Sequence, residues 1–374
     1  MKQEISSLEL HYLVDELKAL ENTKVDRIYH SKESKNELVI ALHKSGEGKR
    51  FLRAQLPGKI FIQEYKSEQQ TPTGLCMMLR KYLEGAILRE ISQAGFERAL
   101  TLKFETRTEG KKSSYILIIE LFSKGNIIFC DDEHKILNLL EEQHWKDREL
   151  KKDSIYIYPK SKYDTLELGE QRFIDIIKGS PKESIVKALA IELNLGGIYA
   201  EELCMDIDKS QKPGDIDEKT LSLLYKRFKD LFNRKHQANK ADGNILPFIL
   251  ELSKTGTIHY QSFNEAIAQN NNIEIDKARV EREKQISKLR LIIDDQNSNL
   301  IDCENNYKEN QDKAGYIYSH YREIDEMLKT LNKIRENHSW KDIKDKISKD
   351  EIFKRIIKDI DEKNNQIIIE FNDK

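Results

Sequence analysis

The sequence predicts an α+β protein: a mostly antiparallel, two-layer β domain with flanking helices, a helical domain, and one long coiled-coil helix. Three observations support this prediction. Strand-like runs recur between turn residues at the start of the chain, helical periodicity follows, and a heptad repeat comes later. We expect a β-rich domain at 1–165, a helical domain at 166–240, a return segment packing on the first domain at 241–270, the coiled-coil helix at 271–336, and the start of a middle region at 337–374.

The β-rich domain opens with an amphipathic stretch, Ile5–Leu20, that predicts a helix. Ser6 or Ser7 is the expected N-cap, and the carboxylates of Glu4 and Glu9 favour the positive end of the helix dipole.

Eight strands and a second helix complete the prediction for this domain. The second helix is expected to begin at Pro72, because the missing N–H costs nothing in a first turn. Turns are expected at 57–58 and 124–126. The expected strands are Lys24–His30, Glu37–His43, Arg50–Leu56, Lys59–Gln63, Ile87–Gln93, Ala99–Phe104, Tyr115–Leu121 and Asn126–Cys130.

The helical domain is predicted from a change in the spacing of apolar residues, from strand-like alternation to helical periodicity. One helix is expected to begin at Pro181 and to end at the LNLGG sequence, Leu193–Gly197, after which Ile198–Cys204 begins the next. A longer basic helix is predicted over Thr220–Lys240. Residues 241–265 return to strand character, which predicts that the first domain is discontinuous and closes over a helical insertion.

The heptad repeat predicts a helix from about Asp276 to Arg335, about 90 Å long at 1.5 Å per residue. Two polar residues on the seam set register. One such helix cannot bury its own stripe, so its partner must be a second helix of the same chain or of another copy. The seam residues are Ile286, Leu289, Ile293, Gln296, Leu300, Cys303, Tyr307, Asn310, Ala314, Ile317, Tyr321, Ile324, Leu328 and Leu331.

Composition limits the function. Charged residues make up 34% of the chain, yet the net charge is −2, so RNA binding must come from local basic patches. The four cysteines are far apart, with no CxxC and no zinc spacing, so we expect no metal and no cofactor. No apolar run has membrane-spanning length and the start is not a signal peptide, which predicts a cytoplasmic protein that does not bind a membrane.

No arrangement of residues predicts catalysis. The chain has no nucleophile elbow, phosphate loop, HExxH motif or Cys/His pair at meaningful spacing. The histidines at positions 11, 30, 43 and 134 lack partners at metal or triad spacing and are read as structural or exposed. We therefore expect a binding protein with no catalytic residues.

Four groups of residues are candidates for nucleic-acid contact, each with a plainer alternative. Arg80-Lys81 either holds a phosphate or is a solvated helix face, and Glu97-Arg98 either recognises a base or ribose or is a surface ion pair. Gly196-Gly197 either offers backbone N–H groups to phosphate or is a helix C-cap. The basic helix either binds RNA phosphate or is a soluble face; its residues are Lys226, Arg227, Lys229, Arg234 and Lys235.

Several sequence blocks, in order, resemble the NFACT family of ribosome quality-control factors, the RqcH and NEMF group long called fibronectin-binding protein A. The blocks are MKQEISSLELHYLVDEL, LRKYL, YILIIELFSKGNIIFCDDEHKIL, LGGIYAEELC, SFNEAI, YIYSHYREID and SWKDI. The resemblance implies a first domain like that of formamidopyrimidine-type DNA glycosylases, and it identifies LGGIYAEELC as a helix-hairpin-helix turn. This chain begins Met1-Lys2-Gln3 and lacks the glycosylase Pro nucleophile, so glycosylase chemistry is not expected.

The resemblance also implies partners and a function. It implies binding to the large ribosomal subunit obstructed by peptidyl-tRNA, and tRNA recruitment for C-terminal tailing of the stalled chain. It assigns tRNA contact to Glu97 and Arg98 with Glu9 beside them on an exposed concave face, and phosphate contact to Arg80 and Lys81. Where the family has Asp at the positions of Glu9 and Glu97, this chain has one more methylene.

Two further expectations follow from the resemblance. Family members continue with a returning helix, so we read this chain as a fragment and expect two copies to pair antiparallel through the seam. Two other functions stay open: a DNA-binding relative of the glycosylases, and a fibronectin-binding adhesin.

Overall fold

The computed structural model describes residues 4–64, 71–108, 111–145, 148–159, 163–253, 257–364 and 366–370. Two compact units divide the chain, Met1–Lys277 and Ala278–Lys374. No helix in these ranges is long and apolar enough to cross a membrane.

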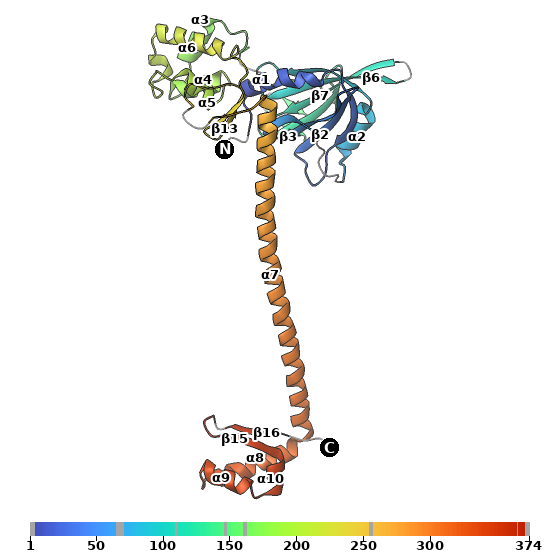
Figure 1. The fold of residues 1–374 in the computed structure, drawn as a ribbon, viewed down its shortest axis with the longest axis vertical. Coiled ribbons are helices and arrows are strands. Elements are labelled where there is room, and N and C mark those ends of the chain that lie inside the picture. Colours follow the sequence, from blue (N-terminus) through green and yellow to red (C-terminus); the bar gives the residue numbers. More distant parts are fainter. Residues whose placement is uncertain are drawn as a thin grey trace. The chain divides into compact units, whose positions relative to one another are not determined.

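A nine-stranded antiparallel sheet forms the centre of the first unit, in the order β4-β3-β2-β1-β5-β6-β7-β8-β9 (Figure 1). The α+β prediction, with a mostly antiparallel sheet, is therefore confirmed. All eight predicted strands are present, with ends that differ by a few residues. The strands are β1 (Lys24–Tyr29), β2 (Glu37–Lys44), β3 (Gly48–Gln55), β4 (Lys59–Gln63), β5 (Ile87–Gln93), β6 (Ala99–Thr108), β7 (Lys111–Glu120), β8 (Asn126–Asp131) and β9 (Ile136–Leu139).

Two helices pack on one face of this sheet and share its core. They are α1 (Ser7–Leu17), continued by the 3₁₀ turn η1 (Lys18–Leu20), and α2 (Gly74–Leu83). Ser6, one of the two predicted candidates, is the N-cap of α1, and it forms a capping box with Glu9 that was not predicted. The prediction for Pro72 is wrong, because Thr73 caps α2 through its hydroxyl and places Pro72 before the helix.

A short segment covers the other face of the sheet at β7 and β8. It contains the small hairpin β10 (Gln143–His144) and β11 (Glu149–Leu150), and it buries Leu150 and Tyr156 against Ile118 and Ile128. Inside this layer Arg148 donates two hydrogen bonds to Glu120, at 2.7 and 3.0 Å, so the buried charge is paired.

The helical domain has its own core, with α1 lying between it and the sheet (Figure 1). Leu8 and Tyr12 of α1 belong to this second core, whereas Leu10 and Leu13 belong to the sheet core. Helix α1 therefore joins the two parts of the unit. The helices of this domain are α3 (Glu170–Lys178), α4 (Ile185–Glu192), α5 (Gly197–Leu203), the 3₁₀ turn η2 (Pro213–Asp215) and α6 (Glu218–Asp230).

Two helix boundaries differ from prediction. Helix α4 begins at Ile185 after a Ser184 cap, not at Pro181, because the Ser184 side chain accepts a hydrogen bond from Lys187 N. The predicted helix Thr220–Lys240 ends at Asp230, because the chain must extend after it to form a strand. The break at LNLGG is confirmed, and Asn194 (φ 57°) and Gly196 (φ 85°) make it.

The return segment forms a three-stranded sheet of β13 (Asn244–Leu246), β12 (Asn239–Ala241) and β14 (Ile258–His259). Residues of this small sheet and its flanks are buried in both the sheet core and the helical core. Ala238 is buried in the sheet core, whereas Phe248 is buried in the helical core.

Helix α7 (Phe263–Ser319) begins on the first unit and is anchored at its first residues. Phe263 and Ile267 are buried in the sheet core. Both carboxylate oxygens of Glu16 accept hydrogen bonds from this end of the helix, from Phe263 N at 2.9 Å and Asn264 N at 2.7 Å. The Asn264 amide pairs with edge strand β4, accepting from Ile62 N at 2.6 Å and donating to Ile62 O at 3.1 Å.

The long helix predicted from about Asp276 to Arg335 is present but is interrupted. It starts earlier than Asp276, within α7, and it breaks at His320 before α8 (Tyr321–Arg335). Seam side chains of α7 in the second unit are exposed, from 42% for Ile286 to 70% for Tyr307.

The distal end of the seam is buried in part, at a small core, whereas Tyr321 and Leu328 are exposed. Leu331 packs with Ile343, Ile357 and Ile360, and Ile324 is buried as well. The elements of this module are α9 (Trp340–Ile347), α10 (Glu351–Ile356), β15 (Ile357–Asp361) and β16 (Gln366–Ile369).

Candidate nucleic-acid interface

Three segments that are far apart in sequence meet at the amino end of α1. They are the residues around Ser6, the β5–β6 turn that carries Glu97 and Arg98, and the α4–α5 turn at 194–197. A Cβ added to Gly196 would lie 3.5 Å from the Ser6 Cβ, so the α4–α5 turn packs directly on the start of α1. The site therefore joins the sheet to the helical domain.

Arg98 is the partly exposed cation of this site. Its Nη1 donates to Glu4 Oε2 at 2.7 Å, with side-chain exposures of 21% for Arg98 and 45% for Glu4. The Arg98 carbonyl accepts from Leu121 N at 2.7 Å, which fixes the backbone at the start of β6. The backbone of Arg98 is thus fixed, and its partly exposed guanidinium can meet a phosphate or a base edge.

Glu97 is held by the helical domain. Asn194 Nδ2 donates to Glu97 Oε2 at 3.0 Å and to Phe96 O at 3.3 Å. Asn tolerates a positive φ, and Asn194 adopts one at 57°, so the turn conformation and the contact with Glu97 depend on the same residue.

Gln93 links the β5–β6 turn to α1. Its Nε2 donates to Ser7 O and to Glu97 O, both at 2.9 Å. The Gln93 Oε1 and Ser7 Oγ atoms are buried and meet no hydrogen-bonding atom of the described residues.

Glu9 does not lie on an exposed face beside this pair, so that part of the prediction is wrong. Its side chain is 2% exposed. Oε2 accepts from Ser6 N at 2.7 Å, and Oε1 accepts from the Tyr199 hydroxyl at 2.8 Å. Burial, and then the Glu9 carboxylate, raise the pKa of Tyr199 well above its usual value. The longer side chain of Glu9 thus reaches into the contact between the two cores.

Arg80 and Lys81 lie on α2 in different surroundings. Arg80 Nε donates to Ile28 O at 2.8 Å, and the guanidinium packs 5.8 Å from the Tyr29 ring centre, so much of this side chain is used within the sheet domain. Lys81 is exposed, with its ammonium 5.5 Å from the Tyr82 ring centre. Of the two, Lys81 is the freer to meet a phosphate.

The basic residues of the helical domain do not form one open strip. Arg227 donates to Leu203 O and Asp206, Lys229 donates to Leu166 O, and Arg234 donates to Glu202. Glu202 is fully buried and also accepts from the backbone N–H groups of residues 251 and 252. These contacts are structural and local, which leaves Lys226 and Lys235 as the exposed members of the group.

Gly196 and Gly197 have different roles in the turn. Gly196 needs its positive φ of 85° and sits against Ser6, whereas Gly197 is exposed at the first residue of α5. Close packing on α1 is therefore the plainer account of Gly196.

Three residues of the site were missed from the sequence. Glu4 was given only a helix-dipole role, and Gln93 and Asn194 were given none. An Asn directly before Leu-Gly-Gly is a signal for a left-handed turn. Nothing local points to the partner of Gln93, which lies 86 residues away.

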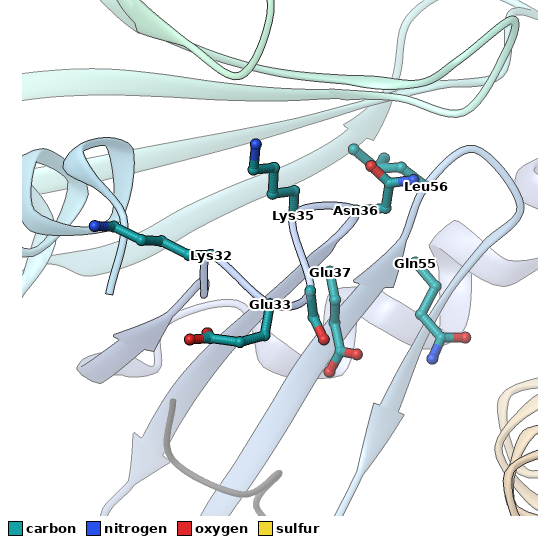
Figure 2. Close-up of a pocket in the computed structure, with 8 residues that line it drawn as sticks. Lys32, Glu33, Lys35, Asn36, Glu37, Gln55 and Leu56 are labelled. Carbon is teal, nitrogen blue, oxygen red and sulfur yellow. The ribbon is translucent and has the colours of Figure 1, made fainter. Parts of the chain in front are cut away.

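An open pocket of about 510 Å³ lies apart from this site, at the β1–β2 loop (Figure 2). Residues 32–37, Gln55 and Leu56 line it. Figure 2 shows that Lys32 and Lys35 point in different directions, while Glu33 and Glu37 bring carboxylates to the same loop. Mixed charges without convergent donors do not make a phosphate site. Across the parts of the chain that the structure describes, no cluster of His, Cys, Asp or Glu could hold a metal.

Comparison with known proteins identifies the family. The family described as NFACT N-terminal and middle domains matches residues 6–367. The chain belongs to the NFACT family. An archaeal Rqc2 homolog, aRqcH of Methanocaldococcus jannaschii, is 29% identical over 395 residues, covering 99% of this chain and 58% of that protein.

A second relative is similar in sequence, and a solved structure is similar in fold. The ribosome quality control complex subunit 2 of Saccharomyces cerevisiae is 30% identical over 141 residues, covering 37% of this chain and 13% of that protein. The N-terminal structure of the fibronectin/fibrinogen-binding protein from Streptococcus suis matches with a TM-score of 0.58 at 23% identity, over 72% of this chain and 99% of that chain. With 58% of the archaeal protein matched, this chain spans little more than half the length of that relative.

Proposed function

We propose that this protein is a ribosome quality-control factor that binds tRNA and the large ribosomal subunit obstructed by peptidyl-tRNA, in the cytoplasm. Two of its relatives carry quality-control names, and family membership covers nearly the whole described chain. In this role it promotes C-terminal tailing of the stalled nascent chain. Peptide-bond chemistry then belongs to the ribosome, and the protein acts without catalytic residues.

The observation that carries the tRNA part is the position of Arg98. Its backbone is fixed, its guanidinium is partly exposed, and its partner Glu4 is a half-exposed carboxylate. An Arg fork meets phosphate with two parallel hydrogen bonds. Lys81, Lys226 and Lys235 are exposed cations that add to phosphate contact, and Glu97, held by Asn194, offers an acceptor to a base or ribose.

The test is binding of deacylated tRNA and of large subunits to the Arg98→Ala variant. A charge-assisted hydrogen bond contributes about 1.5–3 kcal/mol, so tRNA affinity should fall by about tenfold or more. Folding should change little, because the Arg98–Glu4 pair is near the surface. Binding should also weaken steeply as salt increases, because Lys and Arg act by displacing counterions.

Arg89→Ala is the matched control. Arg89 lies on β5 and its exposed side chain makes a 3.3 Å ion pair with Glu105, so the variant loses the same charge away from the site. Equal losses in the two variants, or unchanged tRNA affinity in Arg98→Ala, would count against the proposal. Tight binding to damaged duplex DNA or to fibronectin, without binding to ribosomes, would favour the DNA-binding or adhesin function.

A further inference from the structure

Arg98 meets a carboxylate of its own chain at the place where a phosphate would bind. Among the described residues, Glu4 is the one side chain that bonds to the Arg98 guanidinium, at 2.7 Å. Carboxylate and phosphate can each offer two acceptor oxygens to an Arg fork. Glu4 and an RNA phosphate are therefore alternatives at this position.

Glu4 differs from the other two carboxylates of the site. Glu9 is buried on Tyr199 and Ser6, and Glu97 accepts from Asn194 across the domain contact. Glu4 is 45% exposed, and within the described part of the chain its carboxylate pairs with Arg98. Exposed ion pairs contribute little free energy, so an incoming phosphate can displace this carboxylate at small cost.

Arg98 does not need Glu4 in order to be in place. Leu121 N donates to the Arg98 carbonyl at 2.7 Å, and Gln93 donates to the neighbouring Glu97 carbonyl at 2.9 Å. These backbone bonds hold the residue at the start of β6 whether or not the side chain is paired. Loss of Glu4 thus frees the guanidinium without removing its support.

We propose that Glu4 is a specificity-determining residue that competes with RNA phosphate for Arg98. It lowers the affinity of the site for phosphate as such. A ligand that makes further contacts with the surface displaces the Glu4 carboxylate from Arg98. A simple polyanion makes no such contacts, so it binds more weakly than it would if Arg98 were unpaired. This inference rests on the proposed tRNA binding, and it adds a selection step to that function.

The test compares the affinities of the unchanged chain and Glu4→Gln for deacylated tRNA and for a single-stranded oligouridine. At about 0.1 M salt, Glu4→Gln should bind tRNA about 1.4-fold to fivefold more tightly, the range that an exposed ion pair allows. Oligouridine binding should tighten at least as much, so the preference for tRNA falls. Asp15→Asn is the matched control, because it removes one exposed carboxylate at the other end of α1; both affinities should move less.

A double variant locates the effect. In the Arg98→Ala background, Glu4→Gln should no longer change tRNA affinity. Unchanged or weaker tRNA binding by Glu4→Gln overturns the inference, as does equal tightening in Asp15→Asn or in the Arg98→Ala background. If the unchanged chain binds no tRNA, the proposed function and the inference both fail. If Arg98→Ala loses tRNA binding while Glu4→Gln leaves tRNA affinity unchanged, the proposed function stands and only the inference about Glu4 fails.

Discussion

The buried contact between Glu9 and Tyr199 gives a quantitative test of how the site is supported. Glu9→Gln keeps the shape of the side chain but replaces one acceptor oxygen by an N–H donor. That donor then faces either Ser6 N, which is itself a donor at 2.7 Å, or the Tyr199 hydroxyl at 2.8 Å. Losing one buried, charge-assisted hydrogen bond costs about 1.5–3 kcal/mol.

The same contact can be weakened from the other side. Tyr199→Phe removes the hydroxyl from a fully buried position and should cost about 1–3 kcal/mol. Because the two residues touch, their effects should not add: the double variant should lose about 1–2 kcal/mol less than the sum.

The assay is urea unfolding of each variant with the midpoint and slope fitted together. The slope should stay constant, since the surface exposed on unfolding is unchanged. tRNA affinity of folded Glu9→Gln should stay within about twofold of the unchanged chain, because its carboxylate faces the protein interior. Losses below about 0.5 kcal/mol with no coupling, or a large loss of tRNA affinity at full folding, would refute this reasoning.

Three other predictions concern packing, pH and association. A Cβ at Gly125 would lie 2.7 Å from the Leu56 Cβ at a φ of +75°, so Gly125→Ala should lower the free energy of unfolding by about 2–4 kcal/mol. The control Gly46→Ala has φ +83° but open space, so it should lower the free energy of unfolding by only about 1 kcal/mol. Equal losses in the two variants would contradict the close contact at Gly125. Burial lowers the pKa of His30 in the folded chain, so as the pH falls His30 is protonated in the unfolded chain before it is protonated in the folded chain. The free energy of unfolding should therefore decrease as the pH drops below about 6.5. In urea titrations between about pH 5 and 7 His30→Gln should reduce this decrease, and an equal decrease in the variant would contradict the prediction. Two copies of the chain should pair antiparallel through the exposed seam of α7. Light scattering should therefore give the mass of a dimer for this chain and of a monomer for a version ending near Asn270. If this chain is a monomer at high concentration, or if the shortened version is still a dimer, the copies do not pair through the seam.

Local patterns predicted most of the fold. Alternating residues located the strands, and a serine at position 6 or 7 marked the start of α1. The end of α6 was missed because good helix formers continue past Asp230, and what stops the helix is the pairing of Asn239 with Leu246 and His259. Sequence periodicity contains no information about such pairings.

The candidate site was predicted in part, for the same physical reason. The Glu97-Arg98 pair stands out because two opposite charges precede a strand. The burial of Glu9 depends on Tyr199, which lies 190 residues away, and the pairing of Arg98 depends on Glu4, 94 residues away. A carboxylate on an amphipathic helix reads as exposed until the residue opposite it is known.

The anchor of α7 has a consequence for how the protein is made. Edge strand β4 obtains its partner for Ile62 from Asn264, which is synthesised 202 residues later. At about 5–20 residues per second, the backbone groups of that edge wait roughly 10–40 s for their cover. An uncovered edge strand is a template for pairing with other chains. The growing polypeptide therefore carries open backbone groups at Ile62 until Asn264 is made and pairs with them.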